Sequence, residues 1–372
     1  MTSIRYFILC FLGFVVLPFS LATAQTPDSI SNFSYRIIPD SLSARFPEIR
    51  FSDGCISTRN LDIKKFNDTI FLFVIPDNQD TLSLFTFYFD GEFRYYRRQP
   101  IKYSHGSLSF IGPGWIGITA LNPDTIAMVS ESEVFFYDLI FDQMFYIHRL
   151  PEHQVFTSNH STLQSIPGQP LLVAEFLDFS KPESSMGIVE TEIYAAISYL
   201  DQTIHPIPIF PPQNAAVFSI THAFHFALMG SRLVSRHSSE NEFEIYDLAT
   251  TEMVTKPIPG RLTEPETDTI KREKTLQELS REFMNSRIQQ GMCYNESLEM
   301  LFVFYLLPVK NGNAPAARTV ECNVFDADFS FLGAFFLDEG RFYPSMFFSF
   351  DDKIFLIEAG SALKMRILQM MQ

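Results

Sequence analysis

The stretch EFEIYDLATTEMVTKPIPG, residues 242–260, has the pattern of a β-hairpin. Apolar Phe243 and Ile245 alternate with acidic residues, Asp247 stands where a turn would begin, and residues 253–258 form a second extended run. Alternation with a period of two residues is typical of a strand with one buried face, and aspartate favours turns because its carboxylate accepts backbone hydrogen bonds. The segment therefore predicts strand, turn, strand, and it prompts a search for further copies.

The same pattern recurs along the chain. Five further copies are LSLFTFYFDGEFRYYRRQPI (82–101), SEVFFYDLIFDQMFYIHRLP (132–151), IYAAISYLDQTIHPIPIFP (193–211), ECNVFDADFSFLGAFFLDE (321–339) and a degenerate IFLIEAGSALKMRILQM (354–370). Another extended run, such as LEMLFVFYLLP (298–308), precedes most copies, so that each unit offers three or four strands. We expect the turn acids to be structural; they are Asp90, Asp138, Asp201, Asp247, Asp326 and Glu358.

Repeats of four strands, with a period a little above the roughly 40 to 50 residues usual for such units, are the signature of a β-propeller. We predict an all-β fold, a β-propeller with six blades. Seven blades is the alternative, because FSYRIIPDSL (33–42) could supply an extra outer strand or the strand that closes the ring.

One interruption of the repeats has helical spacing. In residues 264–291, Leu276, Leu279 and Phe283 recur at the interval of a helix face, with charged residues between them. Gly291 is a suitable C-terminal stop. The segment predicts one inserted amphipathic helix.

The first residues have the pattern of a secretory signal. Arg5 precedes an apolar run over residues 6–19, and Ala22 and Ala24 form an A-x-A cleavage site. Pro18 interrupts the run and no basic flank follows it, which disfavours the alternative of a membrane anchor. We expect a signal peptide over residues 1–24 and a single propeller domain over 25–372.

The composition restricts the partners. The chain of 372 residues is 46% hydrophobic, which is ample for a buried core, and carries a formal net charge of −15. A net negative protein repels nucleic acids and anionic membranes, so neither is expected as a partner. Cys55, Cys293 and Cys322 remain after signal cleavage. Cys293 and Cys322 would form a disulfide if their segments pair as neighbouring strands, and the alternative is three buried thiols.

Beyond these patterns, three features together resemble a known family. They are the export signal, the hairpin SEVFFYDL (132–139) preceded by ALNPDTIAMVS (120–130), and the helix running into IQQGMCYNESLEMLFVFYLLP (288–308). The chain is similar to exported Bacteroidetes propeller proteins without an assigned activity, grouped with TolB-like six-bladed propellers. The resemblance implies the fold and a location in the periplasm or at the cell surface of a Gram-negative bacterium.

Members of that family carry an acidic turn followed by an aromatic-rich strand with a basic residue. In this chain Tyr294, Asn295 and Glu296 take the place of the turn. The aromatic strand lacks the basic residue and contains Phe302, Phe304 and Tyr305.

Six Asp-Ser/Thr-aliphatic triplets resemble the O-glycosylation acceptor of that bacterial group. The alternative is that each triplet is a turn that leads into a strand. The acceptor residues would be Ser29, Ser41, Thr69, Thr81, Thr125 and Thr269.

The sequence contains no nucleophile elbow, P-loop, dinucleotide fingerprint or H-E-x-x-H motif, so we expect no cofactor. His222 and His225 would point to opposite faces of a strand and could not share a metal. Propellers bind ligands around the central channel, and we expect the site where the innermost strands begin. Basic residues assigned to those segments predict an anionic ligand; they are Arg59, His105, His160, His222, Arg287 and Arg341.

Two functions are compatible with these patterns. The first is a non-catalytic binding propeller of the cell envelope that recognises a protein, a peptide or a glycan. The alternative is a metal-dependent hydrolase, by analogy with six-bladed lactonases, in which Asp62, Asn159 and Asp352 are the conceivable ligands. We favour binding, because the inner segments offer no recognisable cluster of acidic residues.

Overall fold

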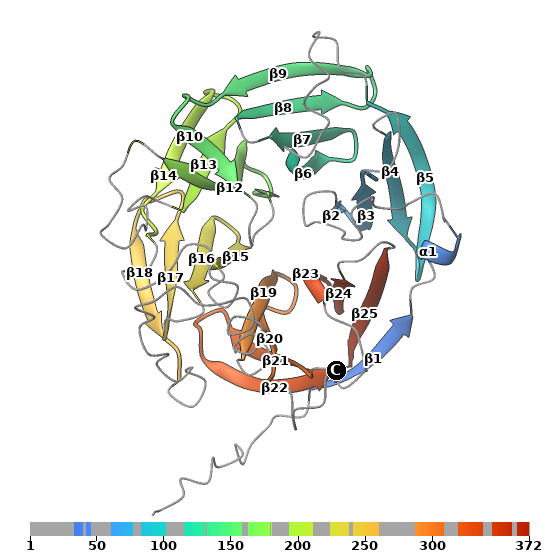
Figure 1. The fold of residues 1–372 in the computed structure, drawn as a ribbon. Helices are drawn as coiled ribbons and strands as arrows, with labels where there is room; N and C mark the ends of the chain where they lie inside the picture. Colours follow the sequence, from blue (N-terminus) through green and yellow to red (C-terminus); the bar gives the residue numbers. More distant parts are fainter. Residues whose placement is uncertain are drawn as a thin grey trace, which may run out of the picture.

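The structure is a computed structural model, and it describes residues 33–39, 42–45, 61–76, 83–101, 115–130, 132–157, 163–178, 180, 193–210, 224–237, 241–259, 287–308, 319–337, 344–358 and 363–371. In these residues the secondary structure consists of β-strands and one short helix, α1 (Leu42–Arg45). The strands form six sheets around a common axis (Figure 1). The prediction of an all-β propeller with six blades is confirmed.

The blades follow one another along the chain. Blade 1 contains β2 (Leu61–Phe66), β3 (Thr69–Val74), β4 (Ser83–Phe89) and β5 (Phe93–Pro100). Blade 2 contains β6 (Trp115–Asn122), β7 (Thr125–Ser130), β8 (Glu133–Asp138) and β9 (Gln143–Arg149). Blade 3 contains β10 (Gln154–Thr157), β11 (Gln164–Ser165), β12 (Leu171–Asp178), β13 (Tyr194–Ser198) and β14 (Thr203–Ile207).

The second half of the chain forms the other three blades. Blade 4 contains β15 (Phe224–Met229), β16 (Arg232–His237), β17 (Glu242–Asp247) and β18 (Met253–Pro257). Blade 5 contains β19 (Ile288–Asn295), β20 (Met300–Leu306), β21 (Val320–Asp326) and β22 (Phe331–Leu337). Blade 6 contains β23 (Pro344–Phe350), β24 (Lys353–Glu358), β25 (Lys364–Met371) and β1 (Ser34–Pro39).

Within a blade, successive strands pair antiparallel from the axis outwards (Figure 1). In blade 3 two short strands, β10 and β11, both pair with β12 and share the innermost position. The first strand of every blade therefore lies nearest the axis, and the last strand of the blade lies at the rim.

The N-terminal strand β1 closes the ring. It pairs antiparallel with β25, from Ser34 opposite Met371 to Pro39 opposite Arg366, and so becomes the outer strand of the last blade. The alternative of seven blades is thereby excluded. Of its two predicted roles, the N-terminal segment has the second, that of the strand that closes the ring. The same arrangement corrects the sixth repeat: Glu358 ends β24, the second strand of its blade, and does not lie in a turn between third and fourth strands.

The core consists of six hydrophobic clusters, and each cluster contains residues of two neighbouring blades. Strand β20 shows how the sequence produces this arrangement. Phe302 and Phe304 pack towards blade 6, whereas the alternate residues Leu301 and Val303 pack towards blade 4. Successive side chains of a strand point to opposite faces, so a strand that is covered on both faces is apolar throughout.

Aspartates start the outer hairpins as predicted. Asp138 Oδ1 accepts hydrogen bonds from the backbone N–H groups of Ile140 (2.8 Å) and Phe141 (2.9 Å). Asp247 Oδ1 accepts in the same way from Ala249 (2.8 Å). These carboxylates satisfy backbone donors that the turn leaves without a strand partner, which confirms their structural role.

The predicted helix is wrong at its C-terminal end. Residues 288–291 belong to the innermost strand β19, and Gly291 lies inside that strand and does not end a helix. The rest of the segment up to residue 286 lies outside the described residues. Residues 1–24, with the predicted signal peptide, also lie outside them. In the part of the chain that the structure describes, no helix has the length and hydrophobicity needed to cross a bilayer.

The closing strand leads to a first prediction. A chain that begins at residue 40 lacks β1 and loses the packing of Ile37 and Ile38 against the clusters on the two sides of blade 6. We expect its free energy of unfolding to fall by about 2 kcal/mol or more, because full burial contributes roughly 1.5–3 kcal/mol per aliphatic side chain and these two side chains are partly buried. Urea unfolding measures the loss, with a chain that begins at residue 32 as the control. Equal stability of the two chains would contradict the assigned closure.

Candidate functional site

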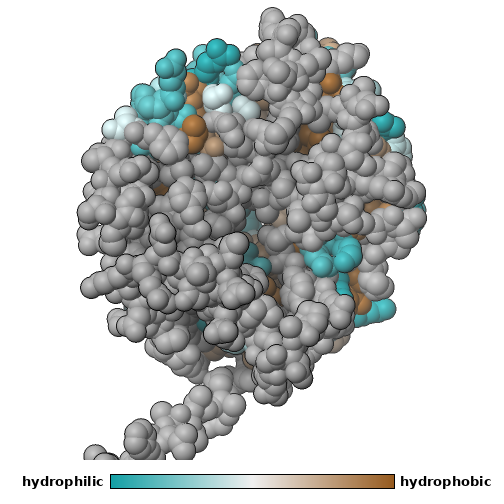
Figure 2. Space-filling model, viewed as in Figure 1, coloured by the Kyte–Doolittle hydropathy of each residue, from teal (hydrophilic) through white to brown (hydrophobic). Residues whose placement is uncertain are grey.

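A cavity of about 390 Å³ lies at the axis, between the innermost strands of five blades. We call it the axial pocket. Strands β2, β11, β15, β19 and β23 contribute its lining. Figure 2 shows a narrow opening near the centre of the ring in which hydrophilic and hydrophobic residues are both visible. Polar residues of its lining include Asp62, Lys64, Lys65, Ser165, Ser297 and Asp351.

The pocket lies at the end of the molecule where the innermost strands finish. Its lining includes Lys65 near the end of β2, Asn67 after β2, Ser297 after β19 and Asp351 after β23. The pocket is thus at the end opposite to the predicted ligand site, which was expected where these strands begin. The turns that leave the innermost strands therefore border the pocket, and their residues are the ones that a ligand would meet.

Asp62 connects three blades beneath the pocket. Its Oδ2 accepts hydrogen bonds from Thr119 Oγ1 and from the backbone N–H of Ala120, both at 2.9 Å. Ser165 Oγ in turn donates to the backbone carbonyl of Ala120 (2.9 Å), and Lys64 Nζ donates to that of Ser165 (3.4 Å). These hydrogen bonds together hold β2, β6 and β11 in a fixed arrangement.

Asp62 is 3% exposed, and this burial raises the pKa of its carboxyl above the ordinary value of 3.8. The positive charge of Lys64 and the hydrogen bonds from Ala120 and Thr119 act against the rise in pKa without cancelling it. Burial dominates because removal from water disfavours the ionised form of a carboxyl group.

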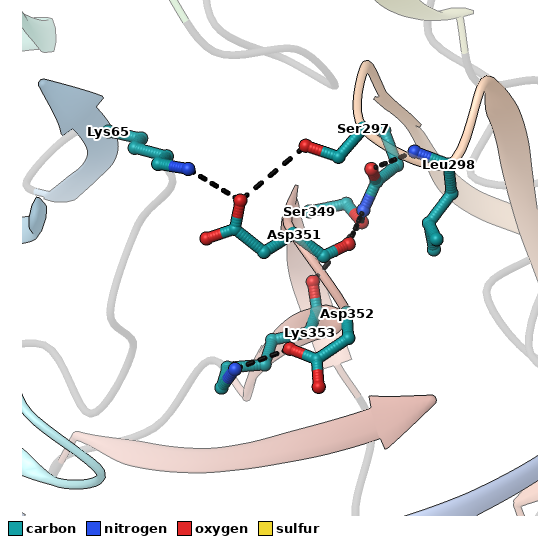
Figure 3. Close-up of polar contacts among 8 residues, drawn as sticks. Lys65, Ser297, Leu298, Ser349, Asp351, Asp352 and Lys353 are labelled. Carbon is teal, nitrogen blue, oxygen red and sulfur yellow. Dashed lines mark hydrogen bonds and ion pairs between the residues drawn. The ribbon is translucent and has the colours of Figure 1, made fainter. Parts of the chain in front are cut away.

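A second network joins blades 1, 5 and 6 on another side of the pocket (Figure 3). Lys65 Nζ lies 2.5 Å from Asp351 Oδ1, and Ser297 Oγ lies 3.5 Å from the same oxygen. Buried Asn295 donates from Nδ2 to Ser349 Oγ (2.7 Å) and to the backbone carbonyl of Asp351 (2.8 Å). The hydrogen bonds of Asn295 thus fix the turn that carries Asp351, the acidic member of the ion pair.

The apolar side of the pocket depends on a close approach between two blades. The Phe347 ring stacks on Phe304 with centroids 4.3 Å apart. A Cβ atom at Gly291 would lie 2.5 Å from this ring, so that only glycine leaves room for it. This contact, and not the end of a helix, explains the glycine at this position.

The predicted anion-binding residues are mostly untested by the structure. Arg59, His105, His160, His222 and Arg341 lie outside the described residues. Only Arg287 is described.

Arg287 lies just before β19. Its Nε is 3.0 Å from Glu321 Oε2, and its guanidinium carbon is 3.5 Å from the centre of the Tyr305 ring. Arg287 therefore already has a carboxylate and an aromatic partner at the strand-start end of the propeller.

Of the conceivable metal ligands, the two that the structure describes do not lie together. Asp62 lines the axial pocket, whereas Asp352 bonds to Lys353 and Gln369 on the outer side of its turn, and Asn159 lies outside the described residues. The described ranges contain no group of three or more His, Cys, Asp or Glu residues that could hold a metal ion. His225 is buried and its Nε2 donates to the backbone carbonyl of Gln289 (3.2 Å), while His222 is not described.

The predicted disulfide is corrected. Strand β20 lies between β19, which carries Cys293, and β21, which carries Cys322, and both residues are free buried thiols. Burial raises the pKa of both thiols above the ordinary value of 9.0, which makes them poor nucleophiles.

Among the triplets with a predicted glycan, two are described. Thr69 and Thr125 are the first residues of β3 and β7, and both are half-buried. Each follows the turn out of an innermost strand, which is the alternative that the sequence offered. The remaining positions, Ser29, Ser41, Thr81 and Thr269, lie outside the described residues.

Sequence reasoning missed Ser165, Ser297 and Asp351. Asp351 could have been found, because SFDDK has the form of a tight turn between two strands. Ser165 and Ser297 carry no such signal in the sequence.

Comparison with known proteins identifies the fold. No family model and no curated protein matches the chain. The crystal structure of a member of the DUF4221 family from Bacteroides vulgatus is similar, with a TM-score of 0.66, 11% identity, and coverage of 92% of this chain and 98% of that chain.

Two further solved structures are less similar. One is a protein from Bacteroides fragilis whose name marks it as a candidate for export, with a TM-score of 0.49, 13% identity and coverage of 93% and 98%. The other is a luciferin-regenerating enzyme, with a TM-score of 0.45, 8% identity and coverage of 90% and 95%. At these identities the likeness extends to the fold alone.

The buried carboxyl leads to a second prediction. Folded Asp62 keeps its proton to a higher pH than the unfolded chain does, so the free energy of unfolding falls as the pH rises from about 4 through the folded-state pKa. Asp62→Asn removes this titration and keeps one oxygen for Thr119 and Ala120. The stability of the variant relative to the native protein should therefore grow with pH, by about 1.4 kcal/mol per unit of pKa shift.

Urea unfolding from pH 4 to pH 8 measures this difference. Asp328→Asn, at an exposed turn residue, gives the reference for a change of surface charge. A difference between Asp62→Asn and the native protein that stays constant with pH would refute the prediction.

The close approach at Gly291 leads to a third prediction. Gly291→Ala places a methyl group against Phe347 and should lower the free energy of unfolding by about 1–3 kcal/mol, as overpacking of a core does. Gly117→Ala is the matched control, because its Cβ would lie 3.4 Å from the nearest atom, an ordinary contact. Thermal unfolding compares the two variants, and equal losses would show that the contact with Phe347 does not matter.

Proposed function

We propose that this protein is a non-catalytic binding propeller that holds a small, neutral, polar ligand in the axial pocket, with the end of a glycan as the favoured ligand. The observation that carries the proposal is the cavity itself. Its volume of about 390 Å³ lies at the lower end of the range of about 300–1,000 Å³ for ligand pockets. A mono- or disaccharide unit is of suitable size.

Most charged groups of the pocket lining have an opposite charge beside them, which favours a neutral ligand, and exposed Glu296 adds one further carboxylate to the lining. Lys65 pairs with Asp351, and the charge of Lys64 acts on Asp62. A pocket with opposite charges side by side presents donors and acceptors together, as hydroxyl groups require, without the single-sign potential that attracts an ion.

The other side of the pocket is apolar. Met292, Phe347 and Phe348 contribute to its lining. A sugar ring has one face of C–H groups and a rim of hydroxyl groups, so that it can use both sides of such a pocket at once. This division of polar and apolar lining is the reason to favour a glycan over a peptide.

The cellular setting of the proposal depends on the predicted signal peptide. An exported propeller would meet glycans and proteins of the periplasm or of the cell surface. A peptide or protein partner that inserts a piece of its backbone into the axial pocket is the second form of the same proposal.

The fourth prediction tests the pocket by blocking it. Ser297 is exposed and borders the pocket, so Ser297→Trp should fill the entrance while leaving the core unchanged. The probes are glucose, galactose, N-acetylglucosamine, maltose and glycylglycine, each at tens of millimolar. A ligand that binds only the folded state raises Tm. We expect at least one sugar to raise the Tm of the native protein and to have no effect on Ser297→Trp.

Ala249→Trp is the control, since Ala249 is exposed in the turn between the outer strands of blade 4 at the same end of the molecule. It should respond to the sugar as the native protein does. A shift with glycylglycine alone would favour the peptide form. The same shift in Ser297→Trp would place the binding site elsewhere, and no shift with any sugar would reject the glycan proposal.

A further inference from the structure

A buried arginine lies between blades 4 and 5, outside the lining of the axial pocket. Arg236, near the end of β16, is 0% exposed. Its Nη1 donates to Gln289 Oε1 (2.7 Å) and to the hydroxyl oxygen of Tyr305. Both partners are neutral, so the positive charge of Arg236 is removed from water without an opposite charge beside it.

The nearby carboxylate does not supply this charge. Glu321 pairs with Arg287 at 3.0 Å, and the buried amide of Asn323 can bridge the same two side chains at 3.1 and 2.9 Å. Among the described residues, no carboxylate lies within ion-pair distance of Arg236. The site therefore keeps one positive charge in excess.

The unsatisfied atoms of Arg236 form one edge of its guanidinium group. Nε and Nη2 are buried and have no hydrogen-bond partner, and the same holds for Nε2 of Gln289. These two arginine atoms are the parallel pair of donors that matches the two oxygens of a carboxylate or of a phosphate. A buried unpaired charge costs several kcal/mol, so a vacant edge of this kind indicates a missing acceptor.

The partners of Arg236 hold it in this orientation. His225 Nε2 bonds to the backbone of Gln289 (3.2 Å), which fixes the start of β19 against β15. The guanidinium group bonds to the oxygen of the Gln289 side-chain amide. The NH₂ group of this amide, Nε2, therefore remains available as a further donor. The donors are thus preorganised on strands and not on loops.

We propose that Arg236 and Gln289 form a buried binding site for a small oxyanion of the carboxylate or phosphate type, held through two parallel hydrogen bonds to Nε and Nη2 of Arg236. The site lies where the innermost strands begin, at the opposite end from the axial pocket, and it is independent of the ligand proposed there. Bound anion neutralises the excess charge and stabilises the interface between blades 4 and 5.

The fifth prediction measures this stabilisation. Native protein is dialysed into chloride, and Tm is followed during addition of inorganic phosphate in one series and of acetate in another, at constant ionic strength and pH. We expect a saturable rise in Tm with at least one oxyanion. A rise in Tm with phosphate alone or with acetate alone identifies which of the two anion shapes fits the site.

Two variants test the assignment to Arg236. Arg236→Lys keeps the charge but lacks the pair of parallel donors, and should lose the rise in Tm. Gln289→Glu places a carboxylate beside Arg236, and should raise Tm in chloride and remove the response to added oxyanion. Arg94→Lys, at a side chain that is 51% exposed, is the control and should respond as the native protein does.

Three results would overturn the proposal. The same Tm in all salts would show that no oxyanion binds. An equal rise in native protein and Arg236→Lys would show a general effect of the salt. A native Tm that does not respond to oxyanion, together with a large loss of stability in Arg236→Lys, would show that Arg236 already has a partner within the protein.

Discussion

The burial of both faces of every sheet is the constraint on which this structure depends. A single blade would expose two apolar faces, because its residues alternate between the clusters on its two sides. A stack of sheets transfers this problem to its two ends, whereas a ring has none. Closure is therefore a condition of stability, and the closing strand takes part in it directly: Ile38 packs in the cluster shared with blade 1, and Ile37 in the cluster shared with blade 5.

Much of this fold could be predicted from local patterns. Asp138, Asp247 and Asp326 start their turns as expected, because the hydrogen bonds involved span only a few residues. The failures have long-range causes. Gly291 resembles a helix stop in the sequence, but it is required by the Phe347 ring of the next blade. The sixth copy looked degenerate because its fourth strand is supplied by the other end of the chain.

The candidate sites were harder to predict for the same reason. In LDIKKF, Asp62 looks like an ordinary polar position of a strand, and its partners Thr119 and Ala120 are contributed by another blade. Arg236 in RLVSRH is equally inconspicuous, although it is the most deeply buried cation among the described residues. Unusual burial of a polar group depends on which strands become neighbours, and this information is distributed over the whole chain.

The two ends of the propeller differ in how their polar groups are satisfied. At the axial pocket, Lys65 pairs with Asp351, and Asp62 accepts a hydrogen bond from a neighbouring blade. At the opposite end, Arg287 is compensated by Glu321 while Arg236 has only neutral partners. One scaffold thus carries paired charges around its axial pocket and a buried cation with neutral partners at its opposite end.

Closure by β1 also sets the order in which the molecule can be completed. The outer strand of the last blade precedes every other described strand in the chain, and its partner β25 is the last of them. A chain that emerges N-terminus first must therefore keep Ser34–Pro39 unpaired until Lys364–Met371 have followed. Pairing over so long a separation is slow, and open sheet edges are prone to aggregation meanwhile. Closure of the ring therefore joins the first of the described strands to the last of them.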